Sequence, residues 1–138
     1  MNKRFLILAL AVFLIACDKR TGTDCADKVC DESFAMIMIS FVDKDGAPVS
    51  ITKFSAVNQR TLDTIKAPSS AYTNTIPGAF VVVDDNYLDK LRKNGDDIKV
   101  SGTYEATGAT KSAVIKVSGG ECACHVIKVS GPDKIVVN

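Results

Sequence analysis

The chain has 138 residues, with 17 basic and 16 acidic side chains and a net charge of +1 at pH 7. This balance excludes the concentrated basic surface that nucleic-acid binding requires. The length suits one domain with a buried core. Val, Ile and Thr are frequent, which favours strands, and tryptophan is absent.

The amino-terminal residues have the pattern of a secretion signal. Lys3 and Arg4 precede an unbroken apolar run from Phe5 to Ala16. A helix of that length spans about 18 Å, which is too short for a hydrocarbon core about 30 Å thick. The run therefore indicates the apolar centre of a cleaved signal rather than a transmembrane anchor.

The end of this run, Leu14-Ile15-Ala16-Cys17, resembles the lipobox of bacterial lipoproteins. The resemblance implies cleavage before Cys17, attachment of diacylglycerol to its thiol and acylation of the new amino terminus. Two or more acyl chains hold a protein firmly to a membrane. It therefore implies a cell-envelope protein anchored at Cys17, on the periplasmic or surface face of the outer membrane. The alternative is that Cys17 is one more apolar residue ending the signal.

The chain divides into residues 1–16 as signal peptide, 17–33 as lipidated cysteine and tether, and 34–138 as one folded domain. Removal of Lys3 and Arg4 with the signal would change the net charge from +1 to −1. Such a charge gives no polybasic membrane signal, so the lipid is expected to supply the attachment. We expect Cys25 and Cys30 to pin the second part of the tether to the domain.

The pattern from residue 34 onward predicts short strands separated by turns. Alternating or continuous apolar residues, bounded by Gly, Pro, Asn and Asp, indicate strands. A short helix is predicted at Tyr87–Lys93, capped by Asn86 and stopped by Gly95, with Leu88 and Leu91 on one face. The predicted strands are 34–43, 49–57, 78–85, 97–106, 111–118, 122–130 and 134–137, with weaker candidates at 62–67 and 70–76.

Seven to nine short strands at hairpin spacing predict an all-β fold, an antiparallel β-sandwich with one short helix. A small closed β-barrel is the alternative. The residues Val42-Asp43, Gly46 and Pro48-Val49 resemble the first hairpin of transthyretin-like and immunoglobulin-like sandwich domains, including the regulatory domains of carboxypeptidases. That resemblance implies a non-catalytic module.

Four cysteines besides Cys17 form two groups, Cys25 and Cys30 near the start and Cys122 and Cys124 near the end. An oxidising envelope compartment favours disulfides, and four cysteines allow three pairings. If 122–130 is a strand, the Cβ atoms of Cys122 and Cys124 lie about 6.6 Å apart, whereas a disulfide needs about 3.5 to 4.5 Å. We therefore expect bonds between the groups, with the partners left open.

Two alternatives to disulfides are a metal site and a reactive dithiol. The four cysteine sulfurs with His125 would suit Zn²⁺ or Cu(I). However, His125 follows Cys124 directly, so on a strand it would face away from both cysteines. The spacing C-x-C-H also lacks one residue of the haem attachment motif C-x-x-C-H. We therefore expect no metal, and a hydrogen-bonded or solvated role for His125.

No catalytic motif stands out. Asp84 and Asp85, with Asp89 nearby, are expected to favour the start of the helix rather than bind calcium. There is no Gly-rich phosphate loop and no G-x-S-x-G, and a single histidine leaves little material for a nucleophile–base pair.

The sequence therefore predicts a lipid-anchored binding or structural module without catalysis, cofactor or nucleic-acid partner. Its partner would be an envelope protein or surface ligand that the sequence does not identify. The alternative function is a metal-binding or thiol-redox lipoprotein that uses Cys25, Cys30, Cys122 and Cys124. An envelope hydrolase or isomerase with an unrecognised site is the third possibility.

Overall fold

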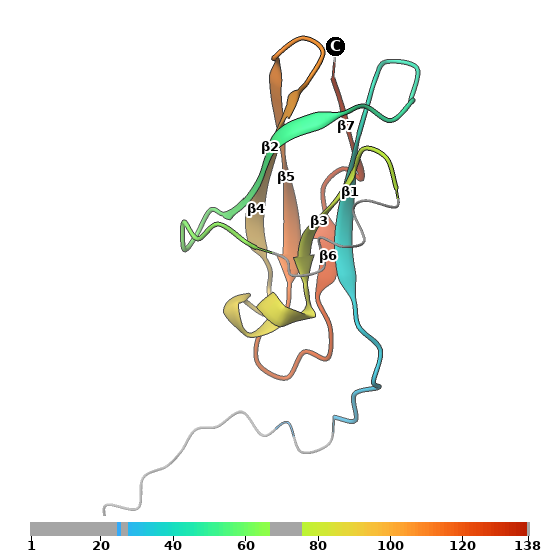
Figure 1. Cartoon of the computed structure of the whole chain (residues 1–138). Coiled ribbons are helices and arrows are strands. Elements are labelled where there is room, and N and C mark those ends of the chain that lie inside the picture. The colour runs from blue at the N-terminus through green and yellow to red at the C-terminus, as the bar shows by residue number, and fades with distance from the viewer. Residues whose placement is uncertain (1–24, 26–27, 67–75, 138) are drawn as a thin grey trace, which may run out of the picture.

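The computed structural model describes residue 25 and residues 28–66 and 76–137, which form two β-sheets and one short 3₁₀ helix (Figure 1). Cys17 and the predicted signal lie outside the described residues. The elements are β1 (Met36–Val42), β2 (Ile51–Asn58), β3 (Ala79–Asp84), η3 (Asp85–Lys90), β4 (Asp96–Tyr104), β5 (Thr110–Ser118), β6 (Ile127–Ser130) and β7 (Lys134–Val136).

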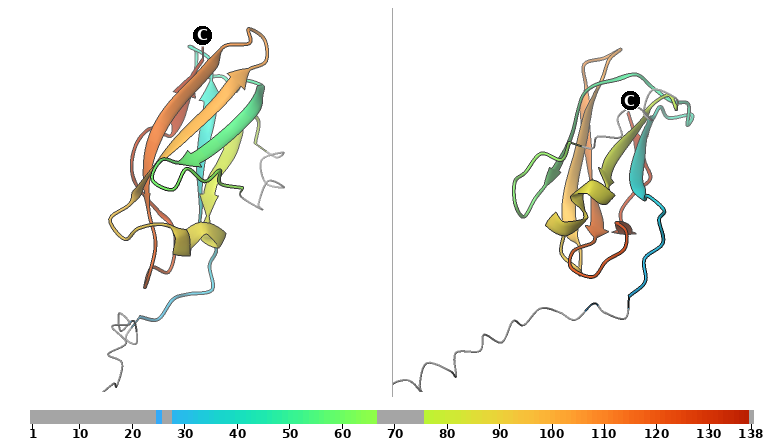
Figure 2. Two further views of the ribbon diagram at one scale, coloured as in Figure 1. Left: turned by 90° about the vertical axis from the view of Figure 1, so that its left-hand side faces the viewer. Right: turned by 60° about the horizontal axis from the view of Figure 1, so that its bottom comes forward.

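The two sheets lie face to face, as Figure 2 shows. One has the order β3-β1-β7 and the other has the order β2-β4-β5-β6. The described strands therefore confirm the predicted all-β sandwich and do not close into a barrel. One pairing differs from the purely antiparallel prediction, because β7 runs parallel to β1, with Phe41 opposite Ile135. A parallel neighbour needs a long connection, and here almost the whole domain lies between the two strands.

The core fills the space between the sheets. Alternate residues of β1, β4 and β5 point inward, which gives each of these strands a row of apolar side chains at spacing two. Phe41 is fully buried and meets Phe80 edge to face, with ring centres 5.8 Å apart. Phe80 in turn stacks on Phe54 of the opposite sheet at 4.5 Å. Among the side chains buried to within 1% are Ile39, Phe41, Ala56, Val82, Val83, Ile98, Val100, Ile115, Val117 and Val137.

In place of the helix predicted at 87–93, the structure has a 3₁₀ helix at Asp85–Lys90, which begins two residues earlier. Its cap is Asp84 rather than Asn86, because an Asp84 carboxylate oxygen accepts the Asn86 backbone N–H at 3.0 Å. The chain becomes extended at Leu91, which is buried in the core. This segment is too short for a stable α-helix, and the tighter hydrogen bonding of a 3₁₀ turn is common in such short pieces.

Two further strand predictions need correction. The weak candidate at 62–67 makes only an isolated bridge, Val57 to Thr64, and most of the candidate at 70–76 lies outside the described residues. The strand predicted at 122–130 begins at Ile127 instead. The preceding residues form turns, because Cys122 has a left-handed φ of 64° and Ala123 donates its N–H to the Gly120 carbonyl.

Candidate functional site

Cys25 and residues 28–35, which we call the strap, lie at one end of the sandwich (Figure 1). The same end holds η3 and the loop of residues 119–126 between β5 and β6, and we call it the strap end. The hairpin between β4 and β5 lies at the opposite end of the molecule, as both figures show. The strap joins β1 at residue 36, so any force on the amino terminus reaches the domain through this end.

Two disulfides fasten the strap to the loop. Cys25 is bonded to Cys122 and Cys30 to Cys124, with Cα atoms 5.5 and 5.3 Å apart. These distances are ordinary for disulfides. The predicted bonding between the two groups is confirmed, and the structure gives the partners that the sequence left open. The geometric premise was wrong, however, because Cys122 and Cys124 lie in turns rather than on a strand.

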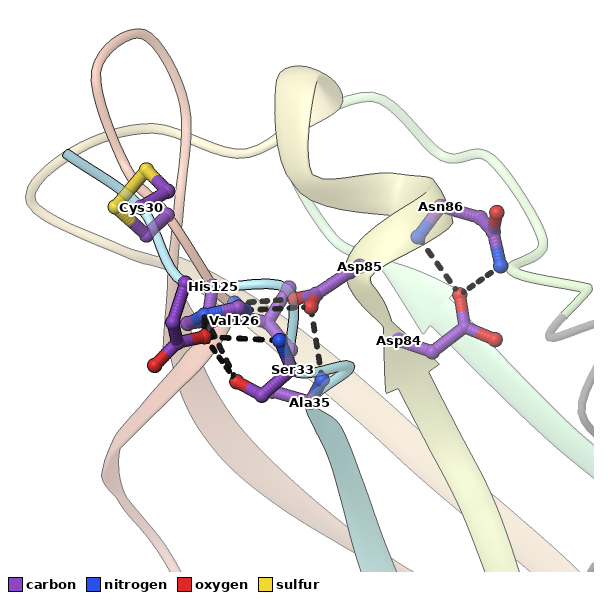
Figure 3. A network of polar contacts seen from close by, with 10 residues as sticks. Cys30, Ser33, Ala35, Asp84, Asp85, Asn86, His125 and Val126 are labelled. Carbon is purple, nitrogen blue, oxygen red and sulfur yellow. Dashed lines mark hydrogen bonds and ion pairs between the residues drawn. A yellow bond between two sulfur atoms is a disulfide. The ribbon is translucent and has the colours of Figure 1, made fainter.

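His125 connects the strap to η3 through both of its ring nitrogens (Figure 3). Its Nδ1 lies 2.7 Å from a carboxylate oxygen of Asp85, and its Nε2 lies 3.0 Å from Oδ1 of Asp31. The hydroxyl of Ser33 lies 3.2 Å from the same Nε2 and donates to Asp31. His125, for which the sequence predicted a hydrogen-bonded or solvated role, is hydrogen-bonded and lies between two carboxylates.

Asp85 is the centre of this cluster. It accepts backbone N–H groups from Ala35 in the strap and from Val126 in the loop, both at 2.8 Å, in addition to the contact with His125. Its own N–H donates to the Ala35 carbonyl at 3.1 Å. The helix-start role that the sequence suggested for Asp85 is thus secondary, because its carboxylate joins the strap, η3 and the loop.

The charges in the cluster reinforce one another. The carboxylates of Asp85 and then Asp31 raise the pKa of His125 above its ordinary value of 6.5. Burial works to raise the pKa of Asp85, but hydrogen bonds from Ala35, His125 and Val126 bring that pKa below its ordinary value. Hydrogen bonds from Ser33, followed by His125, lower the pKa of Asp31. The arrangement therefore favours a positively charged imidazole between two ionised carboxylates.

Ser33, His125 and Asp85 are the residue types of a catalytic triad, yet their geometry suits a different role. A general base must have a free lone pair on the nitrogen that faces the serine. Here Asp31 lies 3.0 Å from that nitrogen and also accepts the Ser33 hydroxyl. An imidazolium that donates from both nitrogens cannot take the serine proton. The cluster therefore acts as a polar clamp that holds the strap.

The sulfurs of the described cysteines and the His125 ring nitrogens already have partners within the protein and are therefore not available as metal ligands. All four cysteines of the described chain are in disulfides, and both nitrogens of His125 face carboxylates. Within the described residues no group of three or more His, Cys, Asp or Glu side chains is placed to hold a metal ion.

The strongest polar network outside the strap end is structural. Asp96 begins β4, and its side chain is 2% exposed. Arg60 donates to both of its oxygens, at 2.7 and 2.6 Å, and Asn58 donates to one of them at 3.1 Å. The hydrogen bonds from Arg60 lower the pKa of Asp96 more than its burial raises it. This network fixes the turn after β2 against the start of β4.

Comparison with known proteins adds no relative. No protein-family model matches the chain, and neither curated proteins nor solved structures give a match. Of the helical residues that the structure describes, none belongs to a helix long and apolar enough to cross a membrane.

Signals for the clamp in the sequence were weak. Asp31 and Ser33 lie in a polar stretch without periodicity, and Asp85 lies 40 residues before His125. No local pattern in the sequence links these positions to His125.

Proposed function

We propose that this protein is a lipid-anchored cell-envelope protein that acts as a non-catalytic binding or structural module. The observation that carries the proposal is the doubly disulfide-bonded strap, which begins at Cys25, shortly after the lipobox-like Leu14-Ile15-Ala16-Cys17. Disulfides persist in oxidising compartments, where a signal of this kind would deliver the chain. The commitment of His125 to the clamp supports a role without catalysis.

The proposed mechanism is presentation. Acyl chains at Cys17 hold the protein in an outer-membrane leaflet, and the strap connects them to a rigid sandwich. An envelope protein or a surface ligand would then bind the sandwich through its loops or through an edge strand. The resemblance of Val42-Asp43, Gly46 and Pro48-Val49 to transthyretin-like and immunoglobulin-like modules supports the same role.

The proposed lipidation, and with it the cell-envelope location, is tested by the mass of the amino terminus. The full chain is expressed in a bacterium that processes lipoproteins, and the wild type is compared with Cys17→Ala. We expect the wild type to begin at an acylated Cys17 and the variant to carry no acyl mass. Cys25→Ser is the matched control and should keep the lipid. An unmodified wild-type chain that still begins at Met1 would refute the proposal.

The module is tested in intact cells. Chemical crosslinking of the lipidated protein should give a discrete larger species that contains the chain. A hydrolytic or isomerase activity that copurifies with the wild type and disappears in His125→Gln would contradict the non-catalytic role.

A further inference from the structure

The disulfides shorten the connection between the proposed lipid and the folded domain. Cys25 is eight positions after Cys17, so the connection can span at most about 29 Å. Without the disulfides, the contacts of the strap at Lys28 and Asp31 are exposed side-chain contacts, and the first strap residue bonded to the domain through its backbone N–H would be Ala35, which donates to Asp85. Eighteen positions would then separate that point from Cys17 and allow about 65 Å. This step rests on the lipidation proposed above.

The shortened connection begins at one particular end of the molecule. Both disulfides end in the loop of residues 119–126, next to η3 and far from the β4–β5 hairpin (Figure 2). β4 (Asp96–Tyr104) runs between the two ends and is about 26 Å long at about 3.3 Å per residue. The maximum reach of the connection is thus close to the length of the domain. The strap end consequently stays within about 29 Å of the lipid.

The strap itself offers apolar side chains to its surroundings. Val29 is 95% exposed and Phe34 is 50% exposed. Both are on the segment that the disulfides and the clamp hold in place, between Cys25 and β1. Of the charged strap residues, Lys28 donates to the Cys122 carbonyl and Asp31 is held by His125, whereas Glu32 is exposed. Apolar and aromatic side chains beside a lipid anchor suit the boundary between headgroups and acyl chains.

We propose that the two disulfides orient the domain, with its strap end against the membrane surface that holds the lipid of Cys17. Val29 and Phe34 contact the headgroup region, and the β4–β5 hairpin faces away from the membrane. The disulfides therefore determine which loops a partner can reach. The occupant of the strap surface is the lipid bilayer rather than a second protein.

The chain has no tryptophan, so single-tryptophan variants report on one position each. The lipidated full-length variants Val29→Trp and Ala106→Trp are reconstituted in phosphatidylcholine vesicles with and without brominated acyl chains. Ala106 is an exposed residue of the β4–β5 hairpin and provides the matched control. We expect brominated lipid to reduce the Val29→Trp fluorescence by about half, as for an interfacial indole, and to leave Ala106→Trp unchanged.

A second variant tests the connection without disturbing either disulfide. An insertion of about twenty Gly and Ser residues between Thr23 and Asp24 gives a flexible connection. With this insertion, we expect Val29→Trp to lose most of its quenching. Quenching that persists unchanged would show that the short connection does not orient the domain, and so would overturn the proposal.

Two other results also overturn the orientation. One is equal quenching at both positions, and the other is no quenching at Val29→Trp in vesicle-bound protein. Failure of the proposed function gives a different result, because the purified chain would then lack acyl mass and would not float with vesicles. In that case the proposed orientation is refuted together with the proposed lipid anchor.

Discussion

His125 shows how a single side chain can join segments that are remote in the sequence. It meets Asp85, 40 positions away, and Asp31, 94 positions away, and all three lie within hydrogen-bonding distance. The hydrogen bond to Asp85 is the largest influence on the pKa of His125, ahead of the hydrogen bond to Asp31. The strap therefore has a polar attachment in addition to its covalent ones.

The chain's one histidine makes this attachment directly measurable, because its ring protons can be followed by NMR as the pH changes. We expect the pKa of His125 to lie above 6.5 in the wild type. Asp85→Asn should lower that pKa more than Asp31→Asn does, since Asp85 is the larger cause. Asp89→Asn, which replaces an exposed residue of η3, should leave the pKa of His125 unchanged. A wild-type pKa at or below 6.5 would contradict the clamp.

The same cluster predicts how stability depends on pH. The pKa of His125 is raised, so its contribution is complete below pH 6.5 and is lost as the pH rises through the raised value. The pKa values of Asp31 and Asp85 are lowered, so their contributions are present above pH 3.8 and are lost as the pH falls through the lowered values.

Thermal unfolding of the wild type and His125→Gln should therefore differ most between pH 3.8 and 6.5 and converge at higher pH. Lys116→Gln removes the exposed ion pair with Asp97 and is the control, with a small and pH-independent effect expected in this range. A difference that grows above neutral pH would have the wrong sign for a charged imidazole.

At the scale of elements, the loop of residues 119–126 explains the main error in strand prediction. Cys122 and Cys124 alternate with other residues as a strand would, but Gly119 and Gly120 are buried against η3 and leave no room for a straight approach. A Cβ on Gly120 would lie 2.5 Å from the Leu91 carbonyl oxygen. This contact is with the segment that directly follows η3, so it is invisible in the local sequence around Cys122.

The free energy of unfolding should fall by different amounts when one disulfide is removed and when the second is then removed as well. With one bond in place, the other closes a ring of only about seven residues, worth about 2 kcal/mol in the chain-entropy model. The first closure of a loop of nearly 100 residues is worth about 4.7 kcal/mol. Replacing Cys30 and Cys124 by serine should thus lower the free energy of unfolding by about 2 kcal/mol, and replacing Cys25 and Cys122 as well by about 7 kcal/mol.

Urea unfolding measures these differences. Lys28→Gln, which removes a strap contact but no sulfur, is the control. Equal losses for the double and quadruple variants would contradict nested loop closure. A thiol titration of denatured, unreduced mature wild type should find no free thiol. Four thiols that appear together with released metal would instead support the metal alternative, and two reactive thiols would support the dithiol alternative.

For the whole molecule, most of the fold but little of the candidate site could be predicted from the sequence. Alternation, apolar runs and turn residues located β1 to β5 and β7. Residues 34–43 are apolar on both faces, which suits the place of β1 between β3 and β7. The clamp and the disulfide partners depend on which loops share an end of the sandwich. Such proximity follows from the packing of the two sheets and from no local pattern.

The pairing of β7 with β1 has a consequence for biosynthesis. A ribosome makes Cys25 and Cys30 before their partners Cys122 and Cys124, which lie 97 and 94 positions later in the sequence. Until these later residues and β7 are made, one neighbour of β1 and both native sulfur partners are missing. In that interval the two early thiols can bond to each other under oxidising conditions, and thiol–disulfide exchange is then needed to reach the native pairs.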